Sequence, residues 1–111
     1  MKRFVIMMLM LAQVATVLAG QYELISDTLT NSKIYPGTTH ALQVYVPGKY
    51  NGQEPACLYV GLDGVLCNAP TVIDTLIAQG KMPVTIGVFL QPGVVHDAMG
   101  NVVRYNRSNE F

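Results

Sequence analysis

The sequence predicts an α/β fold with a mixed sheet built around one helix. Two apolar runs, Cys57–Leu62 and Val84–Leu90, are typical of strands covered on both faces. Between them, residues 69–79 have helical periodicity, and their apolar side chains fall on one face: Val72, Ile73, Leu76 and Ile77. Two buried strands joined by one helix predict a βαβ unit whose strands are parallel.

The chain begins with a segment typical of a secretory signal peptide. Met1–Arg3 is basic, residues 4–18 are apolar except for two polar residues, and small residues stand at Ala19-Gly20. A membrane anchor is the alternative, but a span needs about 20 apolar residues. We expect cleavage near Ala19-Gly20, a secreted or periplasmic location, no membrane span after cleavage, and one small mature domain in residues 21–111.

A further strand is predicted at His40–Val46, after a mixed and polar segment at residues 21–37. Pro47-Gly48 ends it, and the short connection that follows returns the chain in the opposite direction. We therefore expect this strand to lie antiparallel to and directly beside Cys57–Leu62. His40 is expected on the strand surface.

The predicted helix has recognisable ends. It begins near Asn68 or Ala69, with Pro70 at its first positions, where the missing N–H costs nothing. Gly80 supplies a left-handed C-terminal residue, and Pro83 prevents continuation. Three polar residues are expected to point away from the sheet: Asp74, Thr75 and Gln79.

The segment from Gln91 to Phe111 lacks periodicity, and we expect a long loop there. Both faces of Val84–Leu90 are apolar, so this strand needs covering layers on both sides and a paired strand on each edge. About 90 mature residues with one clear helix supply too little for that. We expect an N-terminal part of a longer protein, with an exposed edge along Val84–Leu90; the alternative is a complete small α/β protein.

The composition argues against several classes of function. Seven Lys and Arg balance seven Asp and Glu, which disfavours nucleic acid or anionic membranes as partners. The two histidines have no neighbouring cluster of Cys or carboxylates, so no metal site is predicted. Nor is a cofactor.

No catalytic nucleophile is recognisable in the mature part. None of its serines lies in a G-x-S-x-G motif: Ser26, Ser32 and Ser108. His96 beside Asp97 is interpreted as a solvated loop rather than a catalytic dyad. Cys57 begins a predicted strand, and Cys67 follows the end of that strand. The five extended residues of the strand span roughly 17 Å, which exceeds the reach of a disulfide. We expect two free thiols, with Cys57 in the core.

A candidate site lies beyond the carboxyl ends of the two parallel strands, where open α/β sheets bind ligands. Asp63–Leu66 follows the first strand, and Gln91–Gly93 follows the second. The start of the helix directs free N–H groups to the same edge, which favours negative charge there.

Two family resemblances bear on this site. Val60–Leu66 resembles the D-x-D-G-(T/V)-L opening of haloacid-dehalogenase phosphatases, an apolar strand that ends in the nucleophilic aspartate. Gly61 stands in place of that nucleophile, and Asp63 matches only the general acid/base. A phosphatase remnant is therefore the weaker interpretation.

The second resemblance covers nearly the whole mature chain and is to the enterochelin esterase/feruloyl esterase group of α/β-hydrolases. That group opens with a "vYvP..Y" hairpin, an "l.DG" or "HGG" turn, a helix ending "LIAeGk.P" and an "R…R…E(Y/F)" segment before the nucleophile. The matching pieces here are Pro36–Thr39, Leu42–Pro47, Tyr50, Pro55–Leu58, Leu62–Gly64, Leu76–Pro83 and Arg104–Phe111.

The resemblance implies the N-terminal part of an α/β-hydrolase sheet, with an antiparallel hairpin followed by the βαβ unit. It implies an exported serine esterase whose Ser, acid and His follow in that order, all beyond Phe111. The turn residues Gly64 and Val65 would be the oxyanion-hole candidates through their backbone N–H groups. Candidates for substrate loops are Asp63, Arg104, Arg107 and Glu110.

The implied substrate is a small-molecule or polysaccharide-linked ester, such as a hydroxycinnamate on plant polysaccharide or a siderophore. The alternative from another class is a secreted, non-catalytic module that binds carbohydrate or protein through residues 91–111. Only Tyr105 and Phe111 offer aromatic side chains in that segment.

Overall fold

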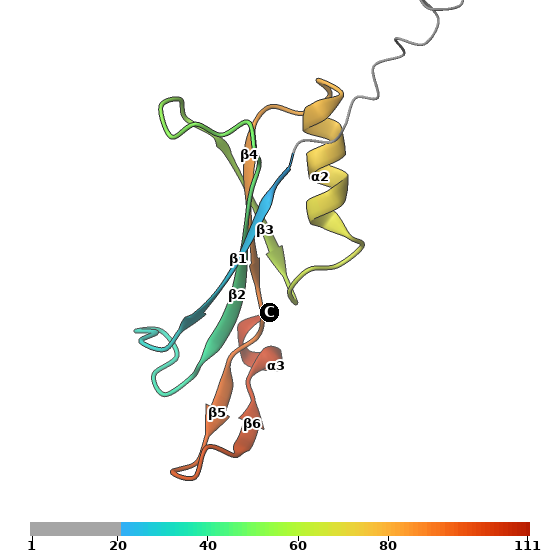
Figure 1. Ribbon diagram of the computed structural model, residues 1–111. Coiled ribbons are helices and arrows are strands. Elements are labelled where there is room, and N and C mark those ends of the chain that lie inside the picture. Colours follow the sequence, from blue (N-terminus) through green and yellow to red (C-terminus); the bar gives the residue numbers. More distant parts are fainter. Residues whose placement is uncertain (1–20) are drawn as a thin grey trace, which may run out of the picture.

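The computed structural model describes residues 21–111, so the predicted signal peptide lies outside the described residues. These residues form a four-stranded mixed sheet with the order β1-β2-β4-β3. One helix, α2, lies along one face of the sheet, and a hairpin extends from the lower end of the sheet (Figure 1). An α/β fold with a mixed sheet was predicted and is confirmed. The strands are β1 (Glu23–Leu29), β2 (His40–Val46), β3 (Cys57–Leu62) and β4 (Thr85–Leu90).

The β3–α2–β4 unit forms as predicted. β3 and β4 are parallel, with Val60 opposite Val88 in the register. The helix α2 runs from Ala69 to Ala78, with Asn68 as its N-cap. Gly80 follows it with a φ of 68°, the left-handed conformation that glycine adopts without cost.

The order of the strands corrects one prediction. β2 does not lie beside β3, because β4 lies between them and pairs with both, antiparallel to β2 and parallel to β3. Skipping one strand requires a step of only about 10 Å, which the connection from Pro47 to Ala56 covers. The strand with two apolar faces thereby obtains a partner on each edge, and the exposed parallel edge belongs to β3 rather than to Val84–Leu90.

A strand that the sequence does not reveal, β1, pairs antiparallel with the whole of β2. All seven of its residues are exposed. An edge strand without a buried face has no need of alternating apolar residues, so the mixed composition of residues 21–37 concealed it. Its pairing depends on backbone hydrogen bonds instead.

The core lies between α2 and the sheet. Tyr45 of β2 and Phe89 of β4 pack there against Ile73 and Ile77 of the helix, and all four are buried. Asp74 corrects a prediction, since it faces the sheet and accepts a 3.0 Å hydrogen bond from the Tyr45 hydroxyl. Burial and the neighbouring Asp74 carboxylate both raise the pKa of Tyr45.

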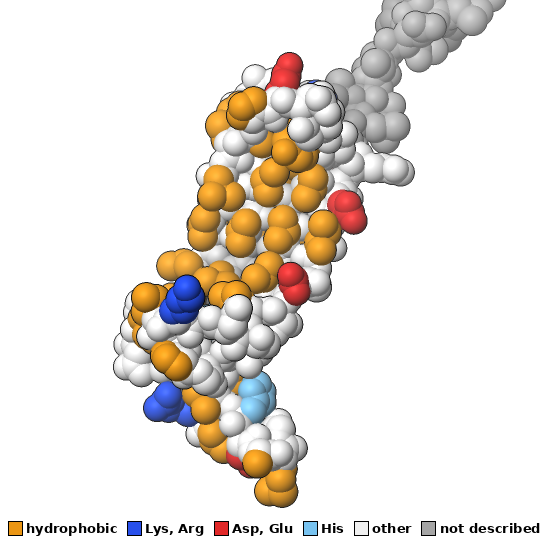
Figure 2. Space-filling model, turned by 90° about the vertical axis from the view of Figure 1, so that its left-hand side faces the viewer, with side chains coloured by type: hydrophobic (Ala, Val, Ile, Leu, Met, Phe, Trp, Pro, Cys, Tyr) orange, Lys and Arg blue, Asp and Glu red, His pale blue; other side chains and the backbone are white. Residues whose placement is uncertain are grey.

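The other face of the sheet carries no layer within residues 21–111. Apolar side chains form rows across all four strands there (Figure 2). On β3, Leu58 is 67% exposed and Val60 is 55% exposed, although both are apolar. We call this surface the bare face; it consists of Ile25, Leu42, Val44, Val46, Leu58, Val60, Leu62, Ile86, Val88 and Leu90.

The C-terminal segment is ordered, which corrects the predicted long loop. Strands β5 (Val94–His96) and β6 (Val102–Tyr105) form a hairpin, and a short helix, α3 (Arg107–Glu110), follows. Thr39, just before β2, exchanges two backbone hydrogen bonds with Val94, of 2.8 and 2.9 Å. The hairpin is therefore attached to the end of the main sheet.

The two cysteines are free, as predicted, but Cys57 is exposed and the prediction that it lies in the core is wrong. It sits on β3, whose edge and faces are open in residues 21–111. Neither helix in this part of the chain combines the length and apolar character that crossing a bilayer requires.

Candidate functional site

The turn between β3 and α2 holds an unusual backbone conformation at the carboxyl edge of the sheet. Asp63 and Gly64 both have left-handed φ angles, of 64° and 78°. The Gly64 N–H donates to the Leu90 carbonyl at 3.0 Å, which extends the β3–β4 pairing by one step. A Cβ at Gly64 would overlap the side-chain amide of Gln91, so a side chain there requires Gln91 to move, and the φ of 78° strains any residue other than glycine.

Of the two predicted oxyanion candidates, the Val65 amide is the one that stays available. Because Leu90 already accepts the Gly64 N–H, that donor is engaged. Within residues 21–111, no backbone or side-chain acceptor bonds the Val65 amide. The Val65 side chain packs against the core, which fixes this residue at the edge of the sheet.

The start of α2 adds to the positive character of this turn. Its N-cap, Asn68, makes no side-chain capping bond, and the first helical turn holds no acidic residue. The N-terminal N–H groups of a helix carry partial positive charge and favour a nearby anion. No acidic side chain in the first turn of α2 offsets that partial positive charge.

Arg107 and Asp63 meet across the site. The guanidinium of Arg107, on α3, donates from Nε to Oδ1 and from Nη2 to Oδ2 of Asp63, each at 2.6 Å. These hydrogen bonds from Arg107 lower the pKa of the Asp63 carboxyl below its usual value of 3.8. Both oxygens of this carboxylate are thus occupied by a partner from within the chain.

Glu110 anchors α3 to the sheet through a buried cluster. Its carboxylate contacts His40 Nε2 at 3.0 Å and accepts hydrogen bonds from the Gly93 N–H and the Asn106 side-chain amide, each at 2.8 Å. His40 is therefore buried against Glu110, and its predicted place on the strand surface is wrong. We call these four residues the Glu110 cluster.

The cluster favours the ionised form of Glu110. Burial by itself raises the pKa of this carboxyl, because a charge loses its hydration. The hydrogen bonds from Asn106, Gly93 and His40 outweigh that effect and hold the pKa below its usual value of 4.5. A buried carboxylate with this many donors is a structural anchor rather than a group free to contact a substrate.

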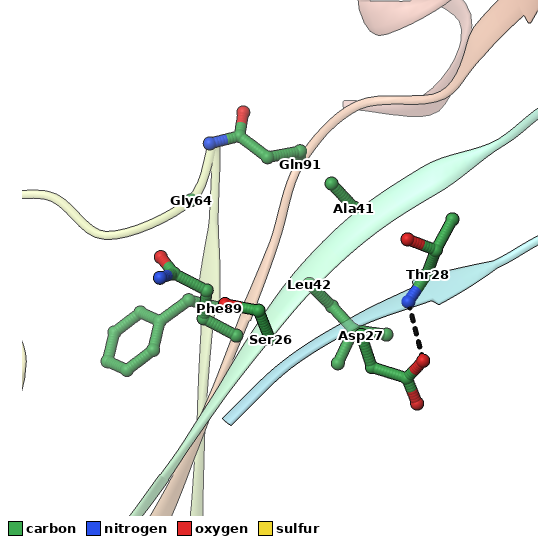
Figure 3. Close-up of a pocket in the computed structure, with 9 residues that line it drawn as sticks. Ser26, Asp27, Thr28, Ala41, Leu42, Gly64, Phe89 and Gln91 are labelled. Atoms are coloured by element: carbon green, nitrogen blue, oxygen red, sulfur yellow. Dashed lines mark hydrogen bonds between the residues drawn. The ribbon is translucent and has the colours of Figure 1, made fainter. Parts of the chain in front are cut away.

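A hollow of about 470 Å³ adjoins the turn. Figure 3 shows Gly64 and Gln91 at one side of it and the strands β1 and β2 at the other. Its lining combines hydroxyl and amide groups with apolar carbons and the Asp27 carboxylate, and it holds no basic side chain. The lining residues are Ser26, Asp27, Thr28, Ala41, Leu42, Gln43, Gly64, Phe89 and Gln91.

The other predicted residues do not join the site. Arg104 lies exposed on β6, and no hydrogen bond or ion pair of its side chain occurs in the described part of the chain. Asp97 caps its own turn by accepting hydrogen bonds from the Met99 and Asn101 N–H groups, and no bond to His96 occurs in residues 21–111. His96 ends strand β5, so the prediction that it lies in a loop is wrong.

Sequence reasoning missed His40 and Asn106 as parts of this edge, whereas Gln91 lies there as predicted. His40 has its partner far away in the sequence, since His40 and Glu110 are 70 positions apart. No spacing rule connects such positions. Among residues 21–111, no group of three or more His, Cys, Asp or Glu side chains could hold a metal ion.

Comparisons with protein-family models, curated proteins and solved structures found no match to this chain.

Proposed function

We propose that this chain forms the N-terminal part of an exported carboxylic-ester hydrolase with an α/β-hydrolase fold. The Asp63-Gly64-Val65 turn supplies one backbone N–H of its oxyanion hole. The nucleophilic Ser, the acid and the His come from polypeptide beyond Phe111.

The available Val65 amide carries this proposal. In α/β-hydrolases, one oxyanion donor comes from the loop between the third strand and the helix that follows it. The turn between β3 and α2 occupies that position, and its Val65 N–H is without an acceptor in residues 21–111. A single preorganised donor of this kind is worth roughly 3 kcal/mol of transition-state stabilisation.

The open edge of β3 supports the remainder of the proposal. A nucleophile elbow needs a further parallel strand whose carboxyl end emerges beside the turn. β3 pairs with β4 on one side only, so its other edge can accept that strand. The hollow beside the turn, lined by hydroxyl, amide and apolar groups and by the Asp27 carboxylate, offers space for a substrate.

The experiment is an assay of the purified full-length protein with p-nitrophenyl acetate and with hydroxycinnamate esters. We expect hydrolysis, and covalent labelling by a fluorophosphonate at a Ser outside residues 1–111, located by peptide mass spectrometry. The absence of both turnover and label would overturn the esterase proposal. The N-terminus of the secreted protein, read in the same spectra, should lie at Gly20 or Gln21.

The rival functions give different results in the same assay. Retention on polysaccharide without turnover would favour the binding module. Release of phosphate from p-nitrophenyl phosphate would favour the phosphatase, but position 61 disfavours it: an added Cβ at Gly61 would lie 2.8 Å from the Phe89 ring. An aspartate nucleophile does not fit there.

A further inference from the structure

We infer that Asp63 and Arg107 are a positioning pair, which holds the Asp63-Gly64-Val65 turn in the shape that presents the Val65 N–H. This inference rests on the proposed function. Neither side chain contacts the substrate in this account, and both act through the backbone of the turn.

The turn needs such a support because its backbone is strained. Asp63 has a φ of 64°, which L-residues other than glycine rarely adopt. Gly64 continues the left-handed conformation, which glycine adopts without cost, so the backbone strain lies at Asp63. Conformations of this kind persist where the surrounding structure over-determines them.

The Arg107 guanidinium holds Asp63 in this conformation. Two parallel N–H···O bonds at 2.6 Å fix both the position and the plane of the Asp63 carboxylate. The Arg107 side chain is 63% exposed and the Asp63 side chain 30%, so this pair contributes little to global stability. Its effect is geometric, which separates it from an ordinary structural ion pair.

Arg107 can support the turn because its own backbone is fixed. The Glu110 cluster holds α3 three residues further on, and Asn106 N–H donates to the Gly93 carbonyl at 2.8 Å just before Arg107. The Tyr35 hydroxyl adds a 2.9 Å bond to the Asn109 carbonyl. A chain of contacts thus runs from the anchored α3 through Arg107 and Asp63 to the Val65 amide.

The test compares Arg107→Ala, Arg107→Lys and Asp63→Asn in the full-length protein, with Arg104→Ala as a matched control. Arg104 lies three positions away in the same segment, is also exposed, and has no partner in residues 21–111. Amide hydrogen exchange of residues 63–68 reports the turn directly. Steady-state kinetics with an ester substrate report its effect on catalysis.

We expect Arg107→Ala and Asp63→Asn each to speed exchange of the turn amides about tenfold or more, because a supported loop becomes free to open. Each should lower kcat about 10- to 100-fold with KM changed less than about twofold, because the lost contact acts on the transition state. Combining Arg107→Ala with Asp63→Asn should lower kcat no further than either change alone, because both remove the same contact. Arg107→Lys should resemble Arg107→Ala, since lysine lacks the planar fork.

The positioning role is overturned if Arg107→Ala exchanges like the wild type, if Arg104→Ala has the same effect, or if Arg107→Lys restores normal kinetics. Thermal midpoints of all variants identify a global loss of folding. The exchange measurement does not depend on ester hydrolysis. A protein that lacks esterase activity but shows the exchange difference therefore refutes the proposed function while it keeps the pair.

Discussion

At the scale of single residues, Gly64 is constrained from two directions. Its φ of 78° lies in the left-handed region, and a side chain there would have to displace the Gln91 amide. Its own N–H is committed to Leu90, so its part in the site is to shape the turn that precedes Val65.

We predict that Gly64→Val lowers kcat and kcat/KM of the full-length protein by a similar factor, about 100-fold, as loss of one oxyanion donor does. The matched control is Gly52→Val in the β2–β3 connection. Gly52 has a φ of 73° with open space around it, so this variant carries the same backbone strain far from the site. Stopped-flow or steady-state ester hydrolysis measures the difference. Equal kcat values for the two variants would contradict the role of Gly64 in the turn.

Glu110 is a second residue whose environment makes a measurable prediction. Because its folded pKa lies below the usual 4.5, its ionised form stabilises the native state above that pH, and the contribution is lost as the pH falls through the folded pKa. We expect Glu110→Gln to lower the free energy of unfolding by about 2 kcal/mol at pH 7 and to remove much of the acid-dependent loss. Denaturant titrations at pH 7 and pH 4 test this, with exposed Glu54→Gln as the control. Parallel pH profiles for wild type and Glu110→Gln would contradict it.

At the scale of elements, β3 combines an apolar sequence with an open edge. Its residues are exposed along nearly the whole strand in residues 21–111, while β4 beside it alternates between buried and half-buried positions. Open, uncharged, apolar edges invite pairing with other strands. The proposal that a further parallel strand of the same protein occupies this edge has a direct test.

We predict opposite effects of Val60→Lys in two contexts. In residues 21–111 alone, Val60 is 55% exposed, so a charge on the bare face should reduce aggregation, as seen by light scattering. In the full-length protein, covered by a further layer, the same change should cost roughly 3 kcal/mol of stability. Val103→Lys on β6, at 60% exposure, is the control and should change little in either context. A full-length Val60→Lys with wild-type stability would mean that the bare face stays uncovered.

The elements that the sequence predicts well are those with a strong local signal. Helix α2 has apolar periodicity, Pro70 and Gly80, and the β3–α2–β4 unit follows from it. The order of the strands has no such signal, because pairing partners are chosen by burial across the whole sheet. Strand β1 lacks apolar alternation for a related reason, since it buries neither face.

The site follows the same division. The turn at Asp63-Gly64 is visible in the sequence, and its place at the carboxyl edge follows from the βαβ unit. The partners of Asp63 and Glu110 are not visible, because Arg107 and His40 reach them through tertiary contacts over 44 and 70 positions. We predicted substrate contacts at Asp63, Arg107 and Glu110. Each of these side chains instead bonds a partner within the chain.

At the scale of the whole molecule, the bare face and the β3 edge set the stability of the isolated segment. Ordering a residue costs about 1.5 kcal/mol, and a sheet with one covered face buries too little to offset this. We predict that residues 21–111 alone unfold without a cooperative transition and do not hydrolyse p-nitrophenyl acetate above background. Calorimetry and the colorimetric assay measure both. A sharp, reversible melt of a monomer would contradict this prediction.

The insertion of β4 between β2 and β3 also governs the order of events during synthesis. Ribosomes add about 5–20 residues per second, so about one to six seconds separate the end of β3 from the completion of β4. Throughout that interval β3 has no neighbour, and only the β1–β2 hairpin can pair. The nascent chain therefore exposes an apolar, unpaired strand from the moment β3 leaves the ribosome until Leu90 has followed it.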